Sequence, residues 1–204
     1  MYYKLFFILL FILPLNVAYS QSDYFKEIKQ FQKDYLGEFV NDEDSPLGIN
    51  DTAFIRFFPI NKKFRITTNF TKVIDSIGFK MLTYNHKEKK YFVYGYISFV
   101  FNRKNYKLFL YQSEKDKLKE STDSYLFLPF KDNTNYIETY GGGRYLDVRE
   151  SDIQNGKLII DFNKCYNPYC AYKGGYSCPI PPKENDLKIK ITAGEKLFAK
   201  KNEE

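Results

Sequence analysis

Residues 91–111 read Tyr91-Phe-Val-Tyr-Gly-Tyr-Ile-Ser-Phe-Val-Phe101, then Asn102-Arg-Lys-Asn105, then Tyr106-Lys-Leu-Phe-Leu-Tyr111, and this stretch decides the fold class. The two outer runs are rich in aromatic and β-branched side chains, which favour strands. The four residues between them have the polar chemistry of a tight turn. The stretch therefore predicts an antiparallel β-hairpin.

Similar runs continue on both sides of this hairpin. They predict further strands at 54–58, 64–70, 79–84, 125–130, 144–148, 157–162 and 187–192. About nine strands at regular spacing predict a mostly β fold, either an antiparallel β-barrel or a β-sandwich, between which the pattern does not decide. One N-terminal amphipathic helix is predicted over 22–40, because apolar side chains recur there at three- and four-residue steps.

The N-terminus has the pattern of an export signal. An apolar run over 5–17 follows Lys4 and ends before Ala18-Tyr19-Ser20, which predicts a signal peptide over 1–20 with cleavage after Ser20. The run is shorter than the roughly 20 apolar residues that span a membrane, and no later segment is apolar enough to do so. We expect an exported protein, periplasmic or secreted, with a single mostly β domain over 21–199 and a frayed tail over 200–204.

The formal net charge of +6 comes from lysines that are interspersed with acids, as in Ser113-Glu-Lys-Asp-Lys-Leu-Lys-Glu120. This is typical of a solvated surface and speaks against a nucleic-acid-binding protein, which gathers its positive charge in one patch. The pattern does not determine the oligomeric state.

All three cysteines, Cys165, Cys170 and Cys178, lie in one long segment between the last two predicted strands. Four prolines and four tyrosines share this segment, and such a long loop is usually functional or well tied down. In an exported protein the cysteines favour one disulfide and one odd thiol, with Cys170–Cys178 as the preferred pair. The only histidine, His86, is far away in sequence, so we expect no metal site.

Several motifs resemble one known family. They are Thr139-Tyr-Gly-Gly-Gly-Arg-Tyr-Leu-Asp147, Asp161-Phe-Asn163, Tyr166-Asn-Pro-Tyr-Cys-Ala-Tyr172, Cys178-Pro-Ile-Pro-Pro-Lys-Glu-Asn185 and Ala193-Gly-Glu195. Together they resemble the bacterial and archaeal family called domain of unknown function 1684, which implies an uncharacterised function. The chain departs from the family pattern at Cys165, where a small residue is usual. The resemblance thereby implies that Cys165 is the odd thiol, which supports the pairing Cys170–Cys178.

The matching region contains candidate ligand-binding residues. Arg144 follows three glycines, whose amides could converge with the guanidinium on an anion, although a simple bend between strands is the alternative. Tyrosine rings could stack on a ligand and asparagine amides could bind a polar group, although both types also serve packing and loop structure. The candidates are Tyr140, Arg144, Tyr145, Asn163, Asn167 and Asn185.

Acids in the same region are candidate catalytic residues. Two of Glu138, Asp161 and Glu184 could act as the carboxylate pair of a hydrolase, although salt bridges and turn caps are the alternative role. No nucleophile elbow, phosphate loop or dinucleotide motif is present, so no cofactor is expected and enzymatic activity stays open. The leading hypothesis is a binding module for a small polar or glycan-like ligand. A hydrolase, or a structural or interaction protein of the cell envelope, are the alternatives.

Overall fold

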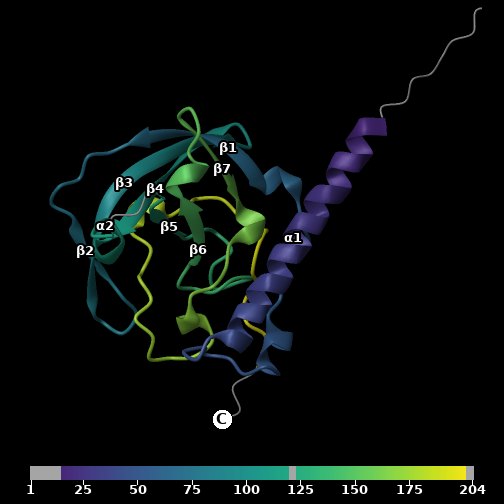
Figure 1. Cartoon of the computed structure of the whole chain (residues 1–204). Helices are drawn as coiled ribbons and strands as arrows, with labels where there is room; N and C mark the ends of the chain where they lie inside the picture. The colour runs from purple at the N-terminus through teal and green to yellow at the C-terminus, as the bar shows by residue number, and fades with distance from the viewer. Residues whose placement is uncertain (1–14, 120–122, 201–204) are drawn as a thin grey trace, which may run out of the picture.

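The computed structural model describes residues 15–119 and 123–200, and in this part the chain forms one seven-stranded antiparallel sheet. The strands run in the order β6-β5-β4-β3-β1-β7, with β2 paired to β3 beside this path. Their bounds are β1 Arg65–Lys72, β2 Phe79–Leu82, β3 Glu88–Phe101, β4 Lys104–Ser113, β5 Tyr125–Phe130, β6 Arg144–Arg149 and β7 Lys157–Asp161. The sheet curls into a half-barrel (Figure 1).

The β3–β4 hairpin confirms the prediction from residues 91–111. Phe101 pairs with Lys104, and Asn102 and Arg103 form the turn with positive φ angles of 48° and 64°. Such a turn matches the right-handed twist of the strands that it joins, and Asn tolerates this conformation better than most side chains. The hairpin forms the middle of the sheet, and the other strands add to it on both sides.

Two of the nine predicted strands are wrong. Residues 54–58 begin as the end of the short 3₁₀ helix η1 (Asp51–Phe54) and then make one isolated bridge, Phe57 to Glu195. Residues 187–192 form no strand, yet Leu187, Ile191 and Ala193 are buried in the main core. Their main-chain groups bond to side chains and loops rather than to a neighbouring strand, for example Ile191 N–H to Asp132 Oδ2 at 2.7 Å.

The predicted N-terminal helix is present as α1, Leu15–Asn41. Ile28, Tyr35 and Phe39 of its apolar stripe are buried, as the three- and four-residue spacing predicts, and Tyr24 is buried as well. Figure 1 shows α1 running along one side of the sheet, with its N-terminal end projecting beyond it. Most of the predicted signal peptide lies outside the described residues, and α1 is continuous across the predicted cleavage position. Within the described ranges no helix is both long and apolar enough to cross a membrane.

Of the two predicted architectures, barrel or sandwich, the structure shows a curled half-barrel that stays open between its two end strands, β6 and β7. These strands are consecutive in the chain and are joined through a tight turn at Asn155 and Gly156, whose φ angles are 51° and 70°. A short 3₁₀ helix, η3 (Glu150–Asp152), interrupts the chain before the turn. Ladder pairing therefore stops at the bridge between Gln154 and Lys157, and β6 and β7 do not pair with each other across the gap. The outer edge of β6 makes one isolated bridge, from Tyr145 to Tyr166.

Candidate functional site

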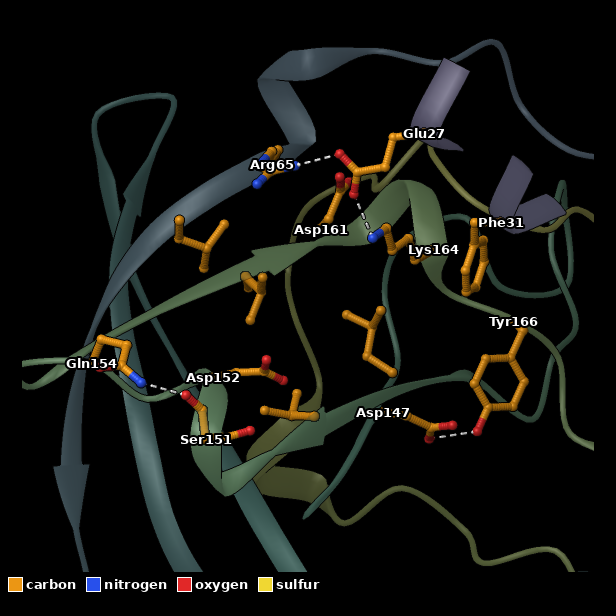
Figure 2. A pocket seen from close by; sticks show the side chains of 14 residues that line it. Glu27, Phe31, Arg65, Asp147, Ser151, Asp152, Gln154, Asp161, Lys164 and Tyr166 are labelled. Carbon is orange, nitrogen blue, oxygen red and sulfur yellow. Dashed lines mark hydrogen bonds and ion pairs between the residues drawn. The ribbon is translucent and has the colours of Figure 1, made fainter. Parts of the chain in front are cut away.

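The gap between β6 and β7 forms a cleft of about 490 Å³ that α1 borders at one end, and we call it the wide cleft. Figure 2 shows its labelled side chains, with Asp147 and Tyr166 close together and Glu27, Arg65, Asp161 and Lys164 grouped in another part of the cleft. Its lining residues are Glu27, Phe31, Arg65, Leu146, Asp147, Val148, Ser151, Asp152, Gln154, Ile159, Ile160, Asp161, Lys164 and Tyr166. The cleft thus combines an apolar surface from the strands with charged groups.

Asp147 is the most distinctive group of the wide cleft. Its Oδ1 accepts hydrogen bonds from the hydroxyls of Tyr125 at 2.5 Å and Tyr166 at 2.6 Å, whereas no described residue donates to Oδ2. The side chain is exposed to solvent even though protein surrounds it on most sides. Desolvation in these surroundings raises the pKa of Asp147, while the two tyrosine hydroxyls and Arg149 act in the opposite direction. Asp147 therefore offers a free, partly desolvated acceptor to a ligand.

The cationic groups of the wide cleft are already paired. Glu27 on α1 accepts from Arg65 at 3.2 Å and from Lys164 at 2.7 Å, and these contacts lower the pKa of Glu27. Beside them Asp161 accepts from the Tyr24 hydroxyl at 2.8 Å and from the side-chain amide of Asn163. This network fixes α1 to the end of β7 and forms one wall of the cleft.

Arg144 is buried and bonds to the protein itself rather than facing a cleft. The side chain is completely buried, and its terminal nitrogens donate to Asp132 at 3.2 Å and to the main-chain oxygens of Ile191, Ala193 and Glu195. The guanidinium therefore holds the C-terminal segment inside the curled sheet, and its Nε, which has no partner within the described residues, is buried away from solvent. The preceding glycines form a bend, since Gly143 has a φ of 94° that favours glycine. We accordingly place the site away from Arg144.

The three candidate asparagines are buried and also bind the protein itself. Asn163 bonds to Asn61, Tyr24 and Asp161. Asn185 accepts from Phe109 N–H at 2.7 Å and donates to the oxygens of Phe109 and Pro129. Asn167 donates to Lys196 O, whereas its Oδ1 has no partner within the described residues.

The remaining candidates do not form one site. Tyr145 and Asn167 line a different, mostly apolar pocket of about 380 Å³, which shares Tyr166 with the wide cleft, whereas Tyr140 packs against Tyr84 with ring centroids 6.0 Å apart. Of the three predicted acids only Asp161 lines the wide cleft. Glu184 is an exposed residue of the 3₁₀ helix η6 (Lys183–Asn185), and Glu138 lies in the loop between β5 and β6. The structure brings no two of these acids together in the wide cleft.

The cysteine-rich segment is tied down as predicted. Cys170 and Cys178 are joined, with their Cα atoms 6.2 Å apart, and Cys165 is the free, buried thiol. Burial raises the pKa of Cys165 to about 12, so its reactive thiolate form is suppressed. Within the described residues no three histidine, cysteine or acidic side chains gather so that they could hold a metal ion.

Glu195 is a completely buried carboxylate outside the lining of the wide cleft. It accepts from Tyr35 on α1 at 2.9 Å, from Tyr172 at 2.6 Å and from Asn167 N–H at 2.8 Å. Desolvation raises its pKa to about 7, and the hydrogen bonds from Tyr172, Asn167 and Tyr35 oppose the shift. Glu195 links α1, the cysteine-rich segment and the C-terminal segment at one point.

The sequence reasoning missed Asp147, Tyr125 and Tyr166 as a cluster. Asp147 ends the motif that begins at Thr139, and Tyr166 begins the next matching motif, so both stood in residues already singled out. The feature that could have identified the cluster is Asp147 itself, an acid inside the strand predicted at 144–148, because a carboxylate in a strand requires a hydrogen-bond partner or water. The short main-chain bridge between Tyr145 and Tyr166 then brings the two motifs together.

Comparisons with known proteins agree on a family and a fold. A model of the family described as "Protein of unknown function (DUF1684)" matches residues 52–196, a range that includes Asp147 and Tyr166 but not α1. The solution NMR structure of an uncharacterised protein of Haloarcula marismortui is similar, with a TM-score of 0.67 and 25% sequence identity. That similarity covers 87% of this chain and 96% of the other. No curated protein matches the chain.

Proposed function

We propose that this chain, which belongs to the DUF1684 family of proteins of unknown function, is a binding module for a small polar or glycan-like ligand. The observation that carries the proposal is the free Oδ2 of Asp147 in a cleft of about 490 Å³. That volume lies within the range of about 300–1,000 Å³ in which small ligands bind. A ligand hydroxyl or amine would donate to Asp147.

Neighbouring groups support the same interpretation. Tyr166 and Phe31 supply aromatic surface beside Asp147, and ring faces of this kind stack on the apolar faces of sugars and other flat ligands. Ser151 and Asp152 contribute further polar groups on the opposite side of the carboxylate. Because the hydroxyls of Tyr125 and Tyr166 hold Asp147 in one orientation, the acceptor is in place before a ligand arrives.

We also propose that the protein is exported. The disulfide between Cys170 and Cys178 supports it, because such bonds persist in oxidising compartments outside the cytosol. The hydrolase alternative has less support, since the predicted acids Glu138 and Glu184 lie outside the wide cleft and Asp161 is occupied by Tyr24 and Asn163.

Native mass spectrometry of the protein purified from its own cells tests the proposal. We expect an extra mass in the native spectrum that is absent under denaturing conditions and that disappears in Asp147→Asn. The matched control is Glu184→Gln, which removes an exposed acid outside the cleft and should keep the adduct. A bare native mass for the wild type, or an adduct that Asp147→Asn retains, contradicts a ligand at Asp147. The denatured mass also reports whether the chain begins at Gln21.

A further inference from the structure

A second, smaller cavity opens beside the wide cleft, between α1, β6 and the cysteine-rich segment, and we call it the narrow cavity. Its volume is about 320 Å³, and it shares Phe31, Asp147 and Tyr166 with the wide cleft. Its lining consists of five aromatic residues and three acids, namely Phe31, Tyr35, Phe39, Tyr166, Tyr169, Asp34, Glu38 and Asp147. No lysine, arginine or histidine belongs to this lining.

The three acids of the narrow cavity are not neutralised by ion pairs. Asp34 accepts only an amide donor, Gln30 at 2.7 Å, and no salt bridge within the described residues includes Asp34, Glu38 or Asp147. Desolvation and the nearby charges of Asp147 and Asp34 raise the pKa of Glu38. The repulsion among these carboxylates would be relieved by a cation between them, whereas the acid Glu27 of the wide cleft already has two basic partners.

The aromatic residues of the lining pack against one another, whereas Asp34, Glu38 and Asp147 are exposed to solvent. Tyr35 stacks on Phe31 with ring centroids 6.4 Å apart and contacts Tyr166 at 5.8 Å, and Phe39 contacts Tyr169 at 5.7 Å. Ring faces attract cations within about 6 Å, and clusters of such rings recognise alkylated ammonium groups. Hydrated metal ions gain little from aromatic walls, and no described acids are arranged to coordinate one. The lining therefore suits a cation with apolar substituents.

We infer that the narrow cavity binds an organic ammonium group that carries alkyl substituents on its nitrogen, as a quaternary ammonium ion does. The inference deepens the proposed function and rests on it for Asp147 and Tyr166, because a ligand that spans both spaces would place its hydroxyl groups in the wide cleft. The ammonium group would lie between Asp34, Glu38 and Asp147 and against the rings of α1 and the cysteine-rich segment.

Calorimetric titration of the full chain with choline tests the inference. The matched probe is 3,3-dimethyl-1-butanol, which replaces the ammonium nitrogen of choline by carbon and so keeps its shape without its charge. We expect choline to bind at least ten times more tightly than the alcohol. Added salt should weaken choline binding, because part of the attraction is electrostatic. Equal binding of the two probes, or no binding of either, overturns the inference.

Variants assign the binding to the narrow cavity. Glu38 lines this cavity but not the wide cleft, so Glu38→Gln should weaken choline binding about tenfold. Glu184→Gln, which changes the net charge equally from an exposed position outside both spaces, should leave the choline affinity unchanged. Equal losses in Glu38→Gln and Glu184→Gln would contradict a local site.

The two proposals fail separately in these experiments. If the native adduct depends on Asp147 but choline binds no more tightly than the alcohol, the ammonium site is contradicted and the proposed binding module is still supported. If choline binding depends on Glu38 but the native mass shows no adduct, the ammonium site is supported and the proposal of a ligand bound in the purified protein is contradicted. The loss of both contradicts both proposals.

Discussion

At the scale of single residues, several polar side chains of the matching motifs are parts of the fold rather than of the binding surface. The side chains of Arg144 and Asp132 form an ion pair and are both completely buried. They make hydrogen bonds to the main chain of 191–195 that a neighbouring strand would otherwise make. Asp147, in the same strand as Arg144, differs because one of its oxygens stays free. The contacts that Arg144 and Asp147 already make within the protein therefore decide which of them is available to a ligand.

Arg144→Ala should destabilise the protein by about 3–5 kcal/mol, because it leaves the buried carboxyl group of Asp132 without its ion-pair partner. Urea unfolding measures this loss. The control is Arg56→Ala, since Arg56 is exposed and its side chain donates one hydrogen bond of 3.3 Å to Leu197 O in the same C-terminal segment. A fully stable Arg144→Ala protein would contradict the structural role and return Arg144 to the candidate binding residues.

Gly194→Ala should also destabilise the protein, by about 1–3 kcal/mol, because Gly194 has a φ of 71° and a Cβ there would overlap Cys165 Sγ. Thermal unfolding of the variant tests this expectation. Gly174→Ala is the matched control, since nothing lies within 4 Å of a Cβ at that position. If the two alanine variants unfold at the same temperature, the packing of Gly194 against Cys165 is not the constraint that we infer.

At the scale of elements, the sheet depends on groups outside its strands. Strands β4 and β5 share a single register pair, Tyr111 with Phe127, and Pro129 on β5 has no N–H to offer. The side-chain amide of Asn185 bonds to both main-chain groups of Phe109 and to Pro129 O. The side-chain amide of Asn185 thus takes the place of a main-chain peptide group between β4 and β5, where these strands do not pair directly.

Asn185→Ala should cost at least about 2 kcal/mol, since it leaves buried main-chain groups of both strands without partners. Hydrogen exchange provides the local readout, because the amide of Phe109 should lose its protection more than the amide of its neighbour Leu108. Asn133→Ala, at an exposed position, is the control. Unchanged exchange at Phe109 would argue against the bridge.

At the scale of the whole molecule, Glu195 joins parts of the chain that are far apart in sequence. Its folded pKa of about 7 lies above the ordinary value of 4.5, so the folded state holds the proton over a pH range in which the unfolded state has lost it. The contribution of Glu195 to stability is therefore greatest below about pH 4.5, decreases as the pH rises towards 7 and stays low above it. The difference amounts to about 3 kcal/mol at most.

Glu195→Gln should reduce the dependence of stability on pH. Chemical unfolding at pH 5 and at pH 8 should show a smaller difference for the variant than for the wild type, because glutamine cannot ionise. Glu184→Gln should keep the wild-type difference, since Glu184 is exposed. An equal pH dependence in the wild type and Glu195→Gln would show that another group is responsible.

Local sequence patterns determined most elements of the fold. The aromatic and β-branched runs of 91–111 specify a hairpin through their own propensity and turn chemistry, and the stripe from Phe25 to Phe39 specifies α1 by its helical period. Seven strands, the helix and the pairing of Cys170 with Cys178 were predicted in this way. Such features depend on neighbours in the sequence or on a few short-range constraints, which a pattern can display.

Tertiary structure alone decided the state of 187–192, the open edge between β6 and β7, and the site at Asp147. Residues 187–192 have the composition of a strand, but Arg144 and Asp132 bind the main chain of 191–193 in the place of a neighbouring strand. Asp147 differs from other acids only through Tyr125, which is 22 residues away, and Tyr166, which is 19 residues away. Hydrogen bonds and desolvation depend on distances in space, and the order of residues along the chain does not contain those distances.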